Sequence, residues 1–212
     1  ETATAHYLNA LSVEEEQPVQ AEDHLYKALF YNPADARPLN TLAGLLLDKG
    51  SVEKADQVMT MASSRMPANK SVHLAAANHW VQRNNIERAL HEWNLALAIS
   101  PAFGRQLFPV FARVLGNEKL RSSLGTYALE PPVWWDAFTR HVASQQNKQS
   151  EISLLLSMRA QSDVPLSELE RQIYIQKYAD AGQWREAFLV WAEGLSIQQR
   201  KELASVYNGS FE

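Results

Sequence analysis

The sequence predicts an all-α protein in which antiparallel helix pairs stack as a right-handed α-solenoid of about 10–11 helices. Three observations support this class. Small residues recur every 34 residues, apolar residues lie at helical spacing between them, and Gly, Asn-Asn or Pro stands where each helix should end. The chain has 212 residues, of which 46% are hydrophobic, so it is long enough to bury a sizeable core.

Columns of residues define the 34-residue period. The columns of small, bulky and proline residues comprise Ala21, Ala55 and Ala89; Leu25, Met59 and Trp93; Ala28, Ala62 and Ala96; and Pro33, Pro67 and Pro101. Small residues let two antiparallel helices approach closely, and bulky residues of the partner helix fill the space beside them. The columns therefore predict a repeated helix pair.

Each repeat is predicted to hold two helices joined by a short turn. Residues 36–49 form the first, and Gly50 ends it in a left-handed conformation. Residues 52–65 form the second, which Pro67 stops. The next repeat has the same form, with helices at 71–83 and 86–99 and a turn at 84–85. The first pair is weaker, because its first helix offers only Tyr7 and Leu8.

The period fades after residue 101. Residues 103–115 still read as a helix, which Pro109 should kink, and residues 118–127 read as a short one. The Pro-Pro break at 131–132 precedes a helical pair at 132–146 and 151–161 that lacks the repeat pattern.

The repeat pattern returns once, near the end of the sequence. Ser167 and Glu170 form a predicted capping box that opens a helix ending at Gly182. The segment from Trp184 to Leu195 then has second-helix spacing. A last helix at 197–207 follows a second predicted capping box, Ser196 with Gln199, and is expected to cover the end of the stack.

These columns resemble the tetratricopeptide repeat (TPR). The matching positions include Leu42-Ala43, Leu46, Gly50, Ala55, Met59, Ala62 and Pro67, and then Ala76-Ala77, Trp80, Ala89, Trp93, Ala96 and Pro101. The resemblance covers three repeats in residues 1–101, the first degenerate, and one unit at 168–195 within the divergent helical pairs and capping helix of 102–207. It implies a scaffold that binds a protein or peptide partner in a concave groove lined by the first helices.

The family's groove positions can be transferred to this sequence. They give Arg37, Asn40, Asp48, Leu74, Asn78, Gln82 and Arg105 as the partner-binding residues, with Phe108 beside Arg105. The side-chain amides of Asn40, Asn78 and Gln82 could form hydrogen bonds with the extended backbone of a bound partner. The alternative is that these positions are simply solvated helix faces. The sequence argues against a receptor for chaperone C-terminal tails. Such receptors hold the terminal carboxylate with Lys, Arg and Asn at fixed groove positions. The corresponding positions here are occupied by His6, Ala10, Thr41, Ser71 and Ala75, which do not provide the Lys and Arg side chains.

The last five residues suggest a following domain and a cellular location. Asn208-Gly209 is a turn signal, and residues 208–212 are similar to the opening strand of β-sandwich carbohydrate-binding modules, so they are a possible start of a following domain. Bacterial cell-envelope proteins that couple helical repeats to such a module accompany exopolysaccharide assembly or export. This resemblance implies a periplasmic or cell-envelope location, with the cytoplasm as the alternative. The chain starts at Glu1 without Met, so we expect a removed leader or an excised domain.

Composition disfavours several function classes. The net charge of −4, with no basic run, argues against nucleic-acid binding. The absence of cysteine excludes disulfides and thiolate metal sites, and the scattered histidines predict no metal site or other cofactor. No apolar run approaches the ~20 residues of a spanning helix, so direct membrane insertion is not expected.

Several other residues allow both a structural and a functional interpretation. The carboxylate cluster Glu14–Glu16 is interpreted as a solvated turn. His73 and His79 are predicted to be packing or surface residues rather than a zinc pair, because they face different sides of one helix. Of Trp134 and Trp135, one is expected in the core and the other at a helix junction, with ligand stacking as the alternative. Trp184 and Trp191 are predicted core residues, and His6 and Tyr7 surface residues at the chain end.

No catalytic motif stands out in the sequence: it has no phosphate-binding loop, no G-x-S-x-G and no H-E-x-x-H. We therefore predict a non-catalytic protein–protein interaction scaffold rather than an enzyme. The alternative is a structural spacer or dimerisation domain, with a possible homodimer, within a larger multidomain protein or enzyme.

Overall fold

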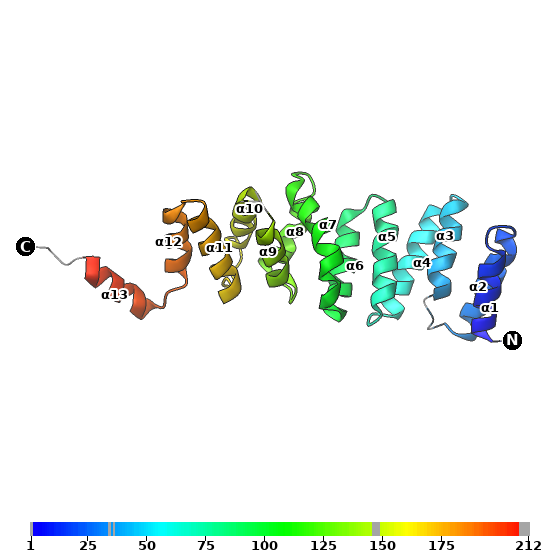
Figure 1. Cartoon of the computed structure of the whole chain (residues 1–212). Coiled ribbons are helices and arrows are strands. Elements are labelled where there is room, and N and C mark those ends of the chain that lie inside the picture. Colours follow the sequence, from blue (N-terminus) through cyan, green and yellow to red (C-terminus); the bar gives the residue numbers. More distant parts are fainter. Residues whose placement is uncertain (1, 34, 36, 146–148, 208–212) are drawn as a thin grey trace, which may run out of the picture. The chain divides into compact units, whose positions relative to one another are not determined.

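The computed structural model describes residues 2–33, 35, 37–145 and 149–207. Over this part the chain is all-helical, with 13 α-helices, one short 3₁₀ turn and no strand (Figure 1). The count exceeds the expected 10–11 because weakly patterned segments, including the first, also form helices. The predicted start of a further domain at 208–212 lies outside the described residues.

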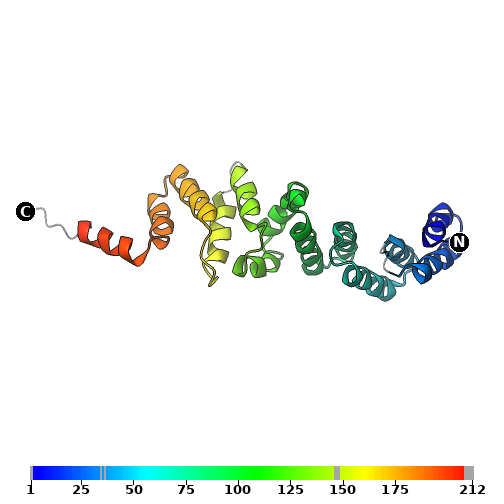
Figure 2. The same cartoon turned by 90° about the horizontal axis from the view of Figure 1, so that it is seen from below.

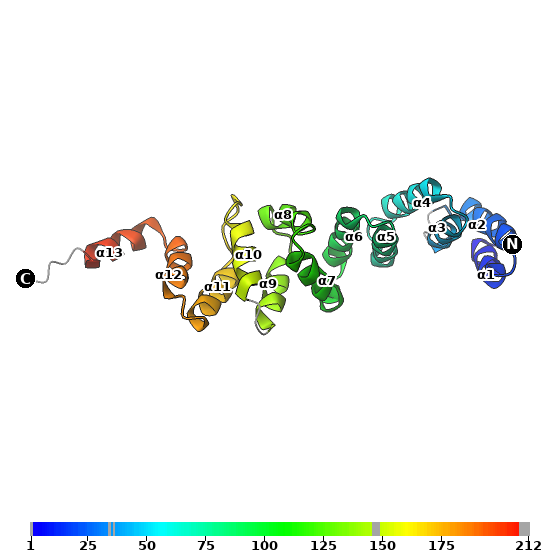
Figure 3. The ribbon, with the colours of Figure 1, turned by 90° about the horizontal axis from the view of Figure 1, so that it is seen from above.

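The described chain divides into two units, one ending at Phe103 and one beginning at Gly104. The first unit contains α1 (Ala3–Val13), α2 (Pro18–Tyr31), α3 (Arg37–Asp48), α4 (Val52–Arg65), α5 (Lys70–Gln82), α6 (Ile86–Ile99) and the 3₁₀ turn Pro101–Phe103. Consecutive helices pack as three pairs, α1 with α2, α3 with α4 and α5 with α6. Within this unit α1, α3 and α5 lie along one side and α2, α4 and α6 along the other (Figures 2 and 3). The first helices thus share a face, as predicted.

The alanine columns lie in the core of the first unit. Ala21, Ala55 and Ala89 are completely buried, and so are Ala28, Ala62 and Ala96 at the next column. The bulky column is buried beside them at Leu25, Met59 and Trp93. The 34-residue period is therefore a period of packing contacts, which is why the small residues recur.

The turns within the helix pairs follow one design. Gly50, Asn84 and Gly182 have positive φ angles of 73°, 54° and 71°. In each case the next residue's N–H donates to a carbonyl five residues back, as with Ser51 to Leu46 at 2.8 Å. This is the Schellman arrangement, which satisfies the last carbonyls of a helix. The predicted turns at Gly50, at 84–85 and at Gly182 are confirmed.

The second unit contains α7 (Gly104–Gly116), α8 (Ser122–Leu129), α9 (Trp135–Ser144), α10 (Gln149–Arg159), α11 (Glu168–Asp180), α12 (Trp184–Glu193) and α13 (Ile197–Tyr207). Pro109 lies inside α7, which continues through it. Both predicted capping boxes form. Ser167 and Glu170 cap α11 reciprocally, and Ser196 and Gln199 exchange bonds of 2.9 and 3.2 Å before α13.

An aromatic cluster fills the core of the second unit. Phe108, Phe111, Trp134, Trp135 and Phe138 are all buried, with neighbouring ring centroids about 5–6.5 Å apart. Trp135 lies in the core and Trp134 lies at a helix junction, as the N-cap of α9, in agreement with the prediction. Both are only 1% exposed, so the Trp at the junction is also part of the core. Phe108 is also a core residue, and its assignment to the groove is wrong.

The core assignment of Trp184 and Trp191 is wrong as well. Their exposed fractions are 70% and 39%, because α12 packs on α11 through Ala187 and Val190 instead. Phe188 and Leu189 of α12 also remain exposed, so the described part of α13 does not provide the predicted cover. Second-helix spacing identified apolar positions here, but no helix covers them.

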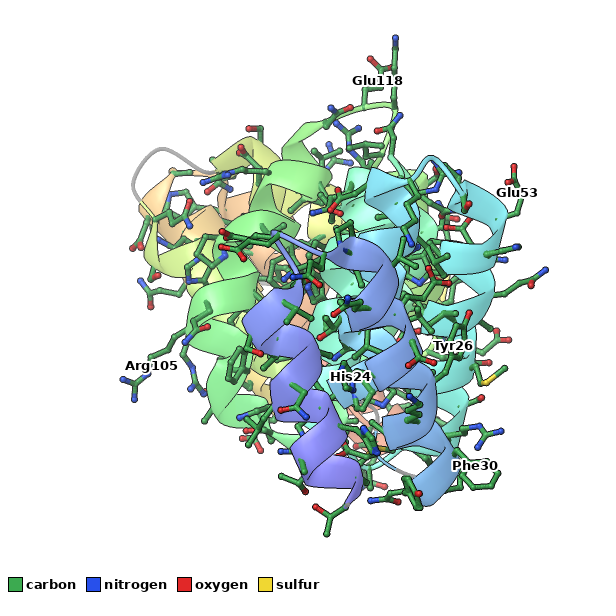
Figure 4. All side chains as sticks on the ribbon, turned by 90° about the vertical axis from the view of Figure 1, so that its right-hand side faces the viewer. His24, Tyr26, Phe30, Glu53, Arg105 and Glu118 are labelled. Carbon is green, nitrogen blue, oxygen red and sulfur yellow. The ribbon has the colours of Figure 1, made fainter. Side chains whose placement is uncertain are left out.

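The surface assignment of His6 is wrong too. Its side chain is buried between α1 and α2, where its Nδ1 lies 3.2 Å from Nδ1 of His24 and its ring stacks on Tyr31. His24 is labelled between the ribbons of these two helices (Figure 4). α1 packs against α2 and buries His6 and Ala10, so His6 belongs to the contact within the first pair. Tyr7, in contrast, is only half-buried.

Candidate partner-binding surface

Six of the seven predicted binding residues lie on the shared face of the first helices in the first unit. Arg37, Asn40 and Asp48 belong to α3, and the other three, Leu74, Asn78 and Gln82, to α5. Asn40 and Leu74 are half-buried, and the other four are exposed. Arg105 belongs to the second unit, where it projects outward from α7 (Figure 4).

The structure brings Arg37 and Asn40 together at a hollow of about 290 Å³. Ser71, at the position of α5 that matches Arg37 in α3, lines the same hollow. Its full lining is Asn32, Asp35, Arg37, Asn40, Met66, Asn69, Ser71 and Val72. Six of these eight residues are polar or charged, and the hollow lies between two neighbouring repeats.

Arg37 is already engaged within this hollow. Its Nη2 lies 2.6 Å from Oδ2 of Asp35, its Nε lies 3.0 Å from Oδ1, and its guanidinium stands 5.3 Å from the Tyr7 ring centroid. The hydrogen bonds from Arg37 hold the pKa of Asp35 below its ordinary value of 3.8. A cation paired in this way is not a free clamp for a terminal carboxylate.

Asn40 differs from its neighbours in the hollow. Its Oδ1 is buried and has no hydrogen-bond partner among the described residues. Asn69, by contrast, caps α5 by accepting from the N–H groups of Ser71 and Val72 at 3.0 and 3.4 Å. A buried acceptor without a partner costs about 1–3 kcal/mol. The Asn40 side chain lines the hollow, so a change of its rotamer would bring this acceptor within reach of a bound N–H.

Leu74, Asn78 and Gln82 form a stripe along α5. They are spaced four residues apart, so they lie above one another on one helix face. The stripe begins beside Ser71 and runs to the last residue of the helix. It combines one half-buried apolar side chain with two exposed amides, a composition suited to an extended backbone.

The histidines of α5 have structural partners. Nδ1 of His73 lies 2.7 Å from Oε2 of Glu92, and its Nε2 lies 3.0 Å from the Pro67 carbonyl. Nε2 of His79 lies 2.8 Å from Oδ1 of Asp56. Both rings are buried in packing roles, as the sequence indicated.

A second hollow, of about 530 Å³, was missed by the sequence reasoning. It lies in the second unit between α10, α12 and the connection at 160–166. Its lining is Leu156, Arg159, Ala160, Ser162, Asp163, Val164, Pro165, Leu166, Tyr178, Glu186, Leu189, Val190 and Glu193. The apolar run 164–166 between two predicted helices was the available signal, since a loop is usually polar.

Neither the comparison with protein-family models nor that with curated proteins gave a match. Within the described residues, no group of three His, Cys, Asp or Glu side chains is placed to hold a metal ion. None of the described helices has the length and apolarity to cross a bilayer.

Proposed function

We propose that this chain is a non-catalytic interaction scaffold of the tetratricopeptide type, which holds an extended segment of a protein partner along α3 and α5. The observation that carries this proposal is the buried, unpartnered Oδ1 of Asn40 in the hollow beside Arg37 and Ser71. A turn of the Asn40 side chain toward the hollow would let a backbone N–H of the partner satisfy that acceptor, and the bond would recover the cost of burying it.

The side chains around Asn40 define the kind of segment. Asn78 and Gln82 continue the face along α5 and can each donate to and accept from a backbone. Leu74 gives one apolar contact between them and the hollow. Because Arg37 is paired with Asp35, the site favours an internal segment over a free C-terminal carboxylate.

The proposal also includes a setting. We place the interaction in a bacterial cell-envelope assembly that builds or exports polysaccharide. Its support is the similarity of residues 208–212 to the opening of a carbohydrate-binding module. A spacer or dimerisation role is the alternative to partner binding.

Site-specific photocrosslinking tests the binding face. A photoreactive residue at Asn78 should capture a discrete partner protein in the source cells, and one at Glu53, exposed on α4 of the opposite side, should not. Glu53 projects away from the ribbon (Figure 4). Equal capture at the two positions would move binding away from the α3–α5 face.

A matched pair of variants then tests the amides against the identified partner. Replacing Asn40, Asn78 and Gln82 together by Ala should weaken binding at least about tenfold, because each lost hydrogen bond contributes roughly 0.5–1.5 kcal/mol. Gln20→Ala with Gln57→Ala, exposed amides of α2 and α4, should leave affinity unchanged. Melting should be unchanged in the control pair and no lower in the triple variant, because removing the unpartnered Oδ1 of Asn40 removes the cost of burying it. Unaltered affinity in the first variant would favour the spacer or dimerisation role.

A further inference from the structure

We propose that the second unit carries a separate binding site, which takes a partner segment whose Lys or Arg side chains flank bulky apolar residues. The site is the 530 Å³ hollow between α10, α12 and the 160–166 connection. It is independent of the α3–α5 face, because none of its lining residues belongs to the first unit.

The floor of this hollow is apolar and partly open to water. Leu156, Tyr178 and Val190 form its base, and Val164 and Leu189 stand on its two walls. The exposed fractions of Val164 and Leu189 are 47% and 57%. Covering both side chains would remove apolar surface from water at about 25 cal/mol per Å², which favours an apolar ligand side chain between them.

The exposed charged side chains that line the hollow are all acidic. Asp163 stands on the connection, while Glu186 and Glu193 stand on α12, and all three are exposed. Glu186 and Glu193 are seven residues apart, which is roughly 10 Å along a helix, with Leu189 and Val190 between them. None of the three forms an ion pair within the described chain.

The one cation in the lining does not offset this charge. Arg159 is buried, and its Nε and Nη2 donate to Glu170 at 2.9 and 3.3 Å. Its Nη1 donates to the Ala128 carbonyl at 2.8 Å, and Nη2 also reaches the carbonyls of Val164 and Pro165 at 3.2 and 3.0 Å. Arg159 therefore fixes the wall of the hollow.

Two other guanidinium groups stand beside the rim, because Arg171 donates to the Leu166 carbonyl at 3.3 Å and Arg200 donates to the Glu193 carbonyl at 2.7 Å. The three carboxylates of the rim exceed these two cations by one.

Charge complementarity selects the occupant. Apolar side chains of the partner would enter the hollow, and Lys or Arg beside them would meet the three carboxylates at the rim. Exposed charges of this kind raise the association rate and are screened by salt. We therefore expect binding that favours cationic over anionic segments of equal apolarity, and that weakens as salt rises.

Two synthetic amphipathic peptides of about 14 residues provide the probes. They share the same Leu positions and differ only in carrying Lys or Glu beside them. Because the chain has no cysteine, Ala160→Cys gives a single labelling point for an environment-sensitive dye in the lining of the hollow. Gly44→Cys in the first unit gives a reporter away from it.

The Lys peptide should change the fluorescence at position 160 but not at position 44, and the Glu peptide should change neither. Replacing Asp163, Glu186 and Glu193 by Lys should weaken binding of the Lys peptide at least about tenfold. The matched control replaces Glu118, Glu130 and Asp180, exposed acids outside the lining, by Lys and should keep the affinity.

Three results would overturn the proposal. Equal binding of the two peptides would show that apolarity alone acts. Equal loss in both charge-reversed proteins would show that net charge, and not this rim, attracts the peptide. Retained affinity in a Leu189→Ser variant that melts like the parent protein would show that no ligand side chain packs between the apolar walls of the hollow.

Discussion

Arg159 binds both carboxylate oxygens of Glu170, and both side chains are almost completely buried. The same carboxylate accepts from Nε1 of Trp135 at 2.8 Å and from the Ser167 N–H at 3.0 Å. This network joins α9, α10 and α11 and satisfies a charge pair in the core. A buried pair of this kind contributes little when intact, but removing one partner leaves an uncompensated charge.

Glu170→Gln should therefore destabilise the second unit by about 3–5 kcal/mol. The amide keeps the shape of the side chain but cannot neutralise Arg159. Thermal unfolding followed by circular dichroism measures the effect, with Glu168→Gln, exposed on the same helix, as the control. A Glu170→Gln protein that melts with the parent would show that Arg159 finds another way to be neutralised.

The alanine columns predict an intolerance to added volume. Ala55→Leu or Ala89→Leu should cost on the order of 1–3 kcal/mol, because neither position has room for a larger side chain. Ala68→Leu, at an exposed position, should be close to neutral. Urea unfolding of the three variants makes the comparison. Neutral results at both column positions would contradict the packing register itself.

Two glycines of the first unit should respond to alanine in opposite directions. Gly50→Ala should destabilise by about 1–2 kcal/mol, since a φ of 73° is unfavourable for a residue with a Cβ. Gly44→Ala should stabilise by about 0.5–1 kcal/mol, because Gly44 lies inside α3 and a Cβ there meets no atom within 4 Å. Melting temperatures that move in the same direction would contradict this account of the turn.

The acidic turn after α1 predicts a dependence of stability on pH. Burial, followed by the charges of Asp48 and Glu15, raises the pKa of Glu14 above its ordinary value of 4.5. The ionised carboxylate is thus disfavoured in the folded protein, and this penalty is absent at low pH and sets in as pH rises through 4.5 and the raised value.

Glu14→Gln should consequently raise the melting temperature at pH 7 and leave it nearly unchanged at pH 3. Glu16→Gln, which is exposed in the same turn, serves as the control. The measurement is a series of thermal melts from pH 3 to pH 7. A gain that is equal at both ends of the range would show that the ionisation of Glu14 is not its cause.

The sequence by itself determined the helices and turns of the first unit. Ala55, Ala89 and Gly50 act through local requirements, which are close approach at a small residue and a positive φ angle after a helix. Such requirements recur with the period of the helix pair, so they are visible as columns. The same reasoning predicted that Asn40 and Asn78 share a face, because position on a helix follows from spacing alone.

Only the tertiary structure decided which apolar faces are covered and which polar groups meet. Trp184 has the spacing of a core residue and yet is exposed, while Trp134 lies outside its helix and yet is buried. Arg159 and Glu170 belong to different helices, and Arg159 also holds the carbonyls of Val164 and Pro165 in the wall of the second-unit hollow. Spacing determines the direction of a side chain from its own helix, but burial and pairing depend on the neighbouring helix, whose position is set by the packing of the whole unit.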